Sequence, residues 1–162
     1  MRVLWAPWRM AYIAGPKQSG CIFCAAAQTQ DLRSQLILLQ QPALVMLNRF
    51  PYSSAHLMVA PQRHTAAFGA LVADELQALM ETVQRSARIL EEALHPDGMN
   101  IGINLGLAAG AGIADHLHWH IVPRWVGDTN FMPMLAEVRV MPQHLEQTYD
   151  LLQPLFAALR GT

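Results

Sequence analysis

Three histidines alternate with large apolar residues in one short segment, His116-Leu117-His118-Trp119-His120-Ile121-Val122. In an extended strand successive side chains point to opposite faces, so all three imidazoles would emerge from one face. The intervening leucine, tryptophan and isoleucine would then enter a core on the other face. Pro123 follows and predicts the end of strand pairing, because proline has no N–H group to donate. Imidazole can act as a nucleophile, a proton carrier or a metal ligand, and we therefore expect this strand to carry the chemistry of the protein.

Length and composition limit the classes of protein that this chain can be. Its 162 residues predict one domain, and a hydrophobic content of 52% supports a substantial core. The formal net charge of -1 argues against a nucleic-acid partner, and no apolar run approaches the roughly 18 residues of a membrane span. The first residues lack the apolar segment of a signal peptide, so we expect a cytoplasmic protein without a membrane partner. In that compartment Cys21 and Cys24 are more often metal ligands or core thiols than a structural disulfide.

Hydrophobic patterns along the chain predict an α+β domain with a mainly antiparallel sheet. Short apolar runs indicate further strands at residues 36–39, 43–47, 56–60 and 99–105. A stripe of apolar residues predicts a long helix over 74–94, with Asp74 and Gln77 as its capping box. A second stripe predicts a C-terminal helix over 143–160, in which Pro154 predicts a kink or an early end. We expect a single domain, 1–162, made of an N-terminal arm (1–20), a core with the histidines (21–125) and a C-terminal extension (126–162).

The histidine segment resembles the signature of the histidine triad (HIT) superfamily, His-φ-His-φ-His-φ-φ with φ apolar. The order of strands, long helix, small-residue loop and signature also matches that family. Trp5-Ala6-Pro7-Trp8-Arg9 and the continuation Pro123-Arg124-Trp125-Val126-Gly127-Asp128-Thr129-Asn130-Phe131 look like the branch that contains the diadenosine tetraphosphate phosphorylases. The resemblance therefore covers most of the chain. It implies a HIT-like fold with about five strands, one long helix and a C-terminal helix.

The resemblance also implies nucleotidyl transfer through a covalent histidine intermediate. His118, the middle histidine, would attack the α-phosphorus of a bound nucleotide, because neutral imidazole is a good nucleophile near pH 7. The backbone carbonyl of His116 would set the tautomer of His118, and His120 would contact the phosphate or leaving-group oxygens. The alternative is three core histidines that hydrogen-bond to the backbone. Three imidazoles on one face in this pattern make that alternative improbable.

Several residues are implied to bind the nucleotide. Asn48 would hold the ribose hydroxyls, although an asparagine at a strand end can also simply form a turn. Asn104 and the loop 106–112, with Gly110 and Gly112, would approach the phosphates, unless this loop is an ordinary flexible connector. Many relatives carry Gln or Ser where this chain has Ala111 and Gly112, so backbone groups would have to make those contacts.

Trp125 is placed by the resemblance near the phosphate site or at a subunit boundary. An ordinary buried aromatic residue is the alternative, and sequence does not separate the two.

A metal site is a second implication of the resemblance. Some HIT proteins complete a zinc site with a Cys-x-x-Cys pair, a later histidine and the first histidine of the triad. The matching residues are Cys21, Cys24, His64 and His116, a sound tetrahedral set for structural zinc. The alternative is two buried thiols and a surface histidine. We expect no redox cofactor.

The leading hypothesis is an enzyme that cleaves dinucleoside polyphosphates. Phosphate as the acceptor would make it a diadenosine tetraphosphate phosphorylase, giving ATP and ADP. Water as the acceptor would make it a hydrolase of dinucleoside polyphosphates or nucleoside phosphoramidates. A nucleotide-binding regulatory protein with little or no turnover is a further alternative, and an intact triad argues against a mere interaction module. The expected partners are the nucleotide substrate, phosphate and a second or further copy of the chain.

Overall fold

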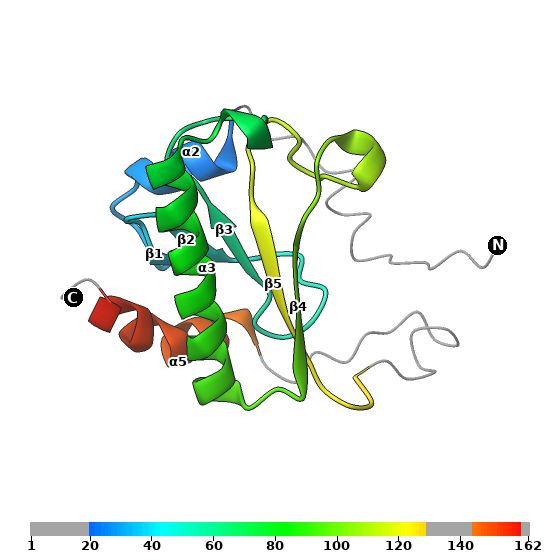
Figure 1. Ribbon diagram of the computed structural model, residues 1–162. Coiled ribbons are helices and arrows are strands. Elements are labelled where there is room, and N and C mark those ends of the chain that lie inside the picture. Colours follow the sequence, from blue (N-terminus) through cyan, green and yellow to red (C-terminus); the bar gives the residue numbers. More distant parts are fainter. Residues whose placement is uncertain (1–19, 129–143, 160–162) are drawn as a thin grey trace.

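The computed structural model describes residues 20–128 and 144–159 and contains a five-stranded sheet (Figure 1). The strand order is β1-β2-β3-β5-β4, and every neighbouring pair is antiparallel. The predicted α+β class with a mainly antiparallel sheet is therefore confirmed. The strands are β1 (Ile37–Leu39), β2 (Leu44–Leu47), β3 (Leu57–Ala60), β4 (Gly98–Ile103) and β5 (Trp119–Arg124). The helices are α2 (Ile22–Gln28), α3 (Ala73–Leu94) and α5 (Leu145–Ala158), with short 3-10 turns η1 (Phe68–Ala70) and η2 (Leu107–Ala109).

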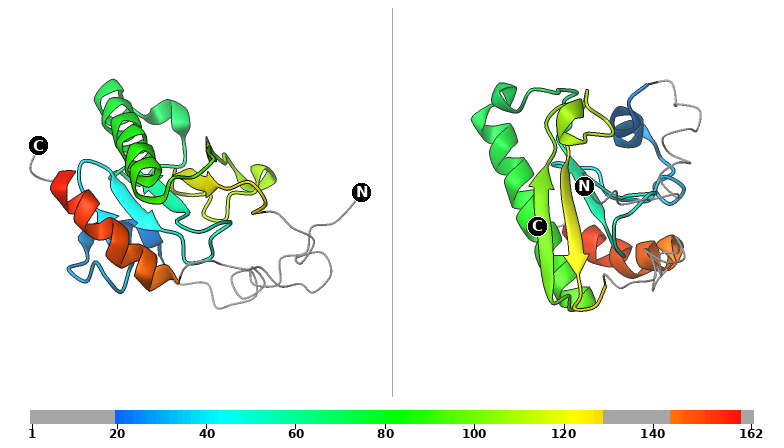
Figure 2. Two further views of the ribbon diagram at one scale, coloured as in Figure 1. Left: turned by 90° about the horizontal axis from the view of Figure 1, so that it is seen from below. Right: turned by 90° about the vertical axis from the view of Figure 1, so that its right-hand side faces the viewer.

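The sheet separates two apolar clusters, because alternate residues of its inner strands point to opposite faces. In β2, Val45 and Leu47 join the cluster that α3 and α5 cover, whereas Leu44 and Met46 join the cluster that α2 covers. The larger cluster includes Phe156 of α5 and is the main core. Figure 2 shows α2 and α3 in different layers on either side of the sheet. The same alternation decides which face the histidines occupy.

Helix α3 begins one residue before the expected position and is capped differently. Val72 is the N-cap, and its backbone N–H donates to the Glu75 carboxylate at 3.1 Å. Arg63 holds the same carboxylate through two charge-assisted bonds of 2.8 Å. The predicted capping box of Asp74 and Gln77 is wrong, because the helix starts earlier and the acidic residue at the third helical position is Glu75.

The predicted end of strand pairing at Pro123 is wrong, and so is an early end of the C-terminal helix at Pro154. Pro123 lies within β5, opposite Met99 of β4, and pairing continues to Arg124. Since β3 pairs with β5 only as far as Ile121, residue 123 has one neighbouring strand and can lack an N–H as on a sheet edge. Pro154 lies on the exposed side of α5, and the helix continues past it to Ala158. Water can hydrate the Asp150 carbonyl, which loses its helical partner.

Among the described residues, no helix is long and apolar enough to cross a membrane. The Trp5-Ala6-Pro7-Trp8-Arg9 motif and the end of the Pro123–Phe131 motif lie outside the described residues, as do the outermost residues of the expected C-terminal helix.

Candidate active site and metal centre

The three histidines lie close together, but only His120 is inside a regular strand. β5 begins at Trp119, so the expected strand covers only the second half of the signature. The preceding part is held by a hydrogen bond of 2.7 Å from the Leu117 N–H to the Thr65 carbonyl. His120 pairs with Met58 across β3 and β5, which places it on the face covered by α2. The rings of His118 and His120 are 4.9 Å apart and nearly perpendicular.

His118 is in the protonation state that a nucleophile requires. Its Nδ1 lies 2.9 Å from the backbone oxygen of His116, and a carbonyl can only accept, so Nδ1 carries the proton. The other ring nitrogen, Nε2, then holds the lone pair. Burial lowers the pKa of His118 below its usual value, although the bond to the carbonyl opposes this effect. A neutral imidazole with a free Nε2 is therefore the favoured form near pH 7.

A fourth histidine, His56, belongs to this cluster and was not predicted from the sequence. Its side chain is fully buried, and its Nδ1 accepts a hydrogen bond of 3.1 Å from the Tyr52 backbone N–H. In the neutral ring the proton is consequently on Nε2, which lies 2.9 Å from Nδ1 of His120. His56 donates this bond, so a neutral His120 carries its own proton on Nε2. Such a group can donate a proton to a phosphate oxygen. The only sequence signal for His56 is a histidine that opens an apolar strand.

Asn48 lies at the end of β2, beside the histidine cluster. Its side-chain oxygen accepts a hydrogen bond of 2.8 Å from the Phe50 backbone N–H, as in a turn-forming asparagine. Its amide nitrogen lies 3.5 Å from Nδ1 of His56. The residue therefore has the turn role and is also within reach of the site, where it is half-buried.

The small-residue loop 106–112 is an ordered turn. Gly106 and Gly110 have φ angles of 80° and 84°, which favour glycine, and η2 lies between them. The backbone N–H groups of Ala109, Gly110 and Ala111 donate to carbonyl oxygens within the loop at 3.0–3.3 Å. These three donors are thus already used. Gly112 follows in an exposed position.

The two remaining candidates for nucleotide binding lie at strand ends. Asn104 follows β4 and is half-buried. Trp125 follows β5, is also half-buried, and exchanges hydrogen bonds with Asp128 in a tight turn. Their roles stay predictions.

Cys21, Cys24, His64 and His116 form the expected metal-binding group. Their ligand atoms all lie within 4.8 Å of one another, and both cysteines are free thiols. Individual separations include 3.2 Å from Cys21 Sγ to His116 Nδ1, 3.3 Å from Cys24 Sγ to His64 Nδ1, and 3.2 Å between the two Nδ1 atoms. A tetrahedral zinc ion with bonds of about 2.0–2.3 Å requires ligand atoms roughly 3.3–3.8 Å apart. The residues therefore fit a structural zinc ion.

Neighbouring groups determine which atoms of these residues can bind a cation. The Nε2 of His116 lies 3.0 Å from the Pro61 carbonyl and donates to it, so Nδ1 is left free to bind metal. Burial and the neighbouring Cys21 raise the pKa of the Cys24 thiol. A bound cation would reverse this effect and favour the thiolate.

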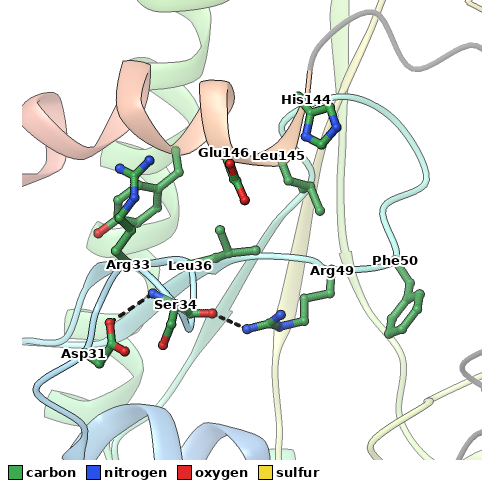
Figure 3. Close-up of a pocket in the computed structure, with 10 residues that line it drawn as sticks. Asp31, Arg33, Ser34, Leu36, Arg49, Phe50, His144, Leu145 and Glu146 are labelled. Atoms are coloured by element: carbon green, nitrogen blue, oxygen red, sulfur yellow. Dashed lines mark hydrogen bonds between the residues drawn. The ribbon is translucent and has the colours of Figure 1, made fainter.

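A separate pocket of about 650 Å³ lies beside the first residues of α5 (Figure 3). Arg33 in this pocket is paired with Asp150, and Arg49 donates to the Ser34 carbonyl. None of the triad histidines lines it. The chemistry of the histidine cluster is therefore not located in this pocket.

The sheet, the buried His118 imidazole with its lone pair on Nε2, and the Cys2His2 group together define a protein that can perform histidine-based group transfer beside a structural metal. The HIT domain family model matches residues 29–126, and the chain belongs to the HIT family.

Known relatives and solved structures agree with this assignment. An "AP-4-A phosphorylase" of Mycobacterium tuberculosis is 36% identical over 158 residues, covering 92% of this chain and 81% of the relative. A "Bis(5'-nucleosyl)-tetraphosphatase [asymmetrical]" of Schizosaccharomyces pombe is 30% identical over 59% of this chain and 52% of the relative. The crystal structure of a zinc-bound histidine triad family protein from Mycobacterium smegmatis is 28% identical, with a TM-score of 0.67 over 88% of this chain and 96% of that one.

Proposed function

We propose that this protein is a diadenosine tetraphosphate phosphorylase that works through a nucleotidyl-histidine intermediate. The observation that carries the proposal is the tautomer of His118, whose Nδ1 is bonded to the His116 carbonyl and whose Nε2 is free. The 36% identity to the mycobacterial AP-4-A phosphorylase, over 92% of this chain, supports the choice of substrate and acceptor.

The reaction takes two displacements at one phosphorus atom. In the first, Nε2 of His118 attacks the α-phosphorus, a P–N bond forms, and the P–O bond to the bridging oxygen breaks to release ATP. The Nε2–H of His120 supplies a proton or a hydrogen bond to the oxygens that gain charge. In the second displacement, inorganic phosphate attacks the same phosphorus, the P–N bond breaks, and ADP leaves with His118 regenerated.

The remaining candidate residues complete this proposal. Asn48 binds the ribose, and Asn104, Gly110, Gly112 and Trp125 lie along the phosphates. Since Ala111 and Gly112 provide no polar side chain, and three loop N–H groups bond within the loop, the phosphate contacts there are few. Acceptor choice then depends on the histidines more than on this loop.

Zinc in the Cys21, Cys24, His64 and His116 group has a structural role in the proposal. Two thiolates and two imidazoles leave no ligand position for substrate, so these residues hold α2 against the catalytic segment.

We further propose a single HIT domain in the cytoplasm that assembles with a second copy of itself. Within the described sheet β4 pairs only with β5, and Ile101 on β4 is 48% exposed. An uncovered edge strand with an exposed isoleucine can pair with the same strand of another copy.

A hydrolase is the second candidate, because the fission-yeast relative carries the name of an asymmetrical tetraphosphatase. One assay separates the two. The purified protein is incubated with diadenosine tetraphosphate, with and without inorganic phosphate, and the products are resolved by chromatography. ATP and ADP formed only with phosphate support the phosphorylase. ATP and AMP formed without phosphate support the hydrolase, and tight nucleotide binding without any product would support a regulatory protein instead.

A further inference from the structure

We propose that Phe23, which lies between the two metal-binding cysteines, is a positioning residue for the imidazole of His118. The ring of Phe23 lies 4.9 Å from the ring of His118 and 5.1 Å from that of His116, measured between centroids. Both separations are typical of packed aromatic pairs. This inference rests on the proposed function, because it takes His118 as the nucleophile.

The other contacts of His118 leave its ring able to rock about one hydrogen bond, and Phe23 restricts that motion. The hydrogen bond from Nδ1 to the His116 carbonyl fixes one edge of the ring, but a ring held at one atom can still rock about it. His120 lies on another side, 4.9 Å away at an interplanar angle of 79°. Phe23 lies at 36° to His118 and presents its ring to it. With Phe23 in place, the direction of the lone pair on Nε2 is set from three sides.

A metal ion bound by Cys21 and Cys24 would hold Phe23 in this position. Helix α2 has seven residues, far below the roughly 12 residues that an isolated helix needs in water. Its position depends on Phe23 and Ala26, which pack beneath the sheet, and on the cysteines that flank Phe23. Cys21 and Cys24 approach His116 Nδ1 at 3.2 and 3.7 Å. A metal shared by these residues would therefore join α2 to the catalytic segment and keep Phe23 in contact with His118.

The effect should fall on the chemical step and leave nucleotide affinity largely unchanged. Only 1% of Phe23 is exposed, so the ring offers almost no surface to a bound nucleotide. A small error in the approach of a nucleophile can reduce its rate by about 100-fold. Phe23 thus controls kcat through the orientation of His118.

The test compares Phe23→Leu with Phe156→Leu, a matched control. Phe156 is also fully buried but lies in the α3/α5 cluster, away from the histidines. We expect Phe23→Leu to slow single-turnover formation of the His118 nucleotidyl adduct by about 10- to 100-fold, with KM changed by less than about 3-fold. Phe156→Leu should lose stability and keep both constants. A wild-type rate in Phe23→Leu, or equal losses in the two variants, overturns the proposal.

A second measurement does not depend on activity. The exchange rate of the His118 Nδ1–H proton with water, followed by NMR in the metal-loaded protein, reports how firmly the ring is held. We expect Phe23→Leu to raise this rate at least about 10-fold and Phe156→Leu to leave it unchanged. An unchanged rate in Phe23→Leu overturns the positioning role. If no adduct forms on His118 in the native protein, the proposed function fails, and the exchange rate still decides the role of Phe23.

The link to the metal is tested with His64→Ala, which removes the exposed ligand and leaves the buried core intact. Loss of metal in this variant should also raise the exchange rate. If the metal acts through Phe23, the variant that combines His64→Ala with Phe23→Leu should have the same exchange rate as Phe23→Leu alone. Fully additive effects would show that the metal does not act through Phe23.

Discussion

Nε2 of the buried His56 lies 2.9 Å from Nδ1 of His120. The Tyr52 backbone N–H fixes the tautomer of His56 from the other side, at 3.1 Å. The hydrogen bonds therefore run from a backbone amide through the His56 imidazole to the imidazole of His120, which is half-buried. This order gives the third histidine of the signature a proton to donate.

The first prediction concerns His56. His56→Phe removes the donor to His120, and kcat should fall by roughly 10- to 100-fold because proton transfer to the leaving group is impaired. His56→Gln places an amide nitrogen near the former Nε2, so it should retain more activity than the phenylalanine variant. Steady-state kinetics with diadenosine tetraphosphate measure both. Equal losses in the two variants would indicate that His56 acts only through packing.

His118→Asn tests the nucleophile with little change in structure. The asparagine amide can still donate to the His116 carbonyl in place of Nδ1, but the variant has no Nε2. We expect no nucleotidyl adduct by mass spectrometry, a loss of turnover of at least about 10³-fold, and nearly unchanged nucleotide binding. His144→Asn, outside the histidine cluster, serves as the control. Turnover retained by His118→Asn would refute the assignment.

The metal centre makes a prediction about composition and stability. The purified protein should contain one zinc ion per chain by elemental analysis, and Cys21→Ser combined with Cys24→Ser should contain none. The double variant should also melt at a lower temperature, by roughly 2–4 °C for each kcal/mol of stability lost. His95→Ala, an exposed histidine at the end of α3, should keep its metal. A native protein without metal would contradict the prediction.

Glu75 predicts a pH dependence of stability. Its bonds to Arg63, and then to the Val72 N–H, lower the pKa of this carboxyl from 4.5 to about 2. A carboxyl with a lowered pKa in the folded state stabilises the fold above its unfolded pKa, and this contribution disappears as the pH falls from about 4.5 to about 2. Thermal melting over that range should therefore show a smaller acid-induced change in Glu75→Gln than in the native protein. Glu81→Gln, an exposed change on the same helix, should follow the native profile.

The apolar patterns predict the elements of this fold well because β1, β2 and β3 are buried along their whole length, and Leu79, Val83 and Leu90 of the α3 stripe are buried as well. Predictions that depend on a single proline are less successful. Pro123 was expected to end strand pairing, and Pro154 to kink or end its helix, but neither occupies a position whose N–H is needed by a buried partner. A missing N–H matters only where a neighbouring strand or a buried carbonyl would accept its hydrogen bond. Local sequence does not reveal which group that would be.

The dependence on neighbours in the fold also explains which histidines the sequence predicts and which it misses. The signature and the Cys-x-x-Cys pair identify residues by local spacing, and the structure places Cys21, Cys24, His64 and His116 together as expected. His56 has no such spacing to the triad. Its partnership with His120 comes from the pairing of β3 with β5, which local pattern does not reveal. The roles of Asn104, Gly110, Gly112 and Trp125 stay predictions.

The division of the sheet into two faces has a consequence for how this chain can change over time. Substitutions beneath α3 and α5 mainly alter the stability of the fold, because Leu90 and Leu152 belong to the main core, on the opposite face of the sheet from His120. Substitutions beneath α2 reach the histidines within one or two contacts. A random library selected for heat resistance should therefore accumulate changes on the first face, and one selected for a new acceptor should accumulate them on the second. Few positions should appear in both collections.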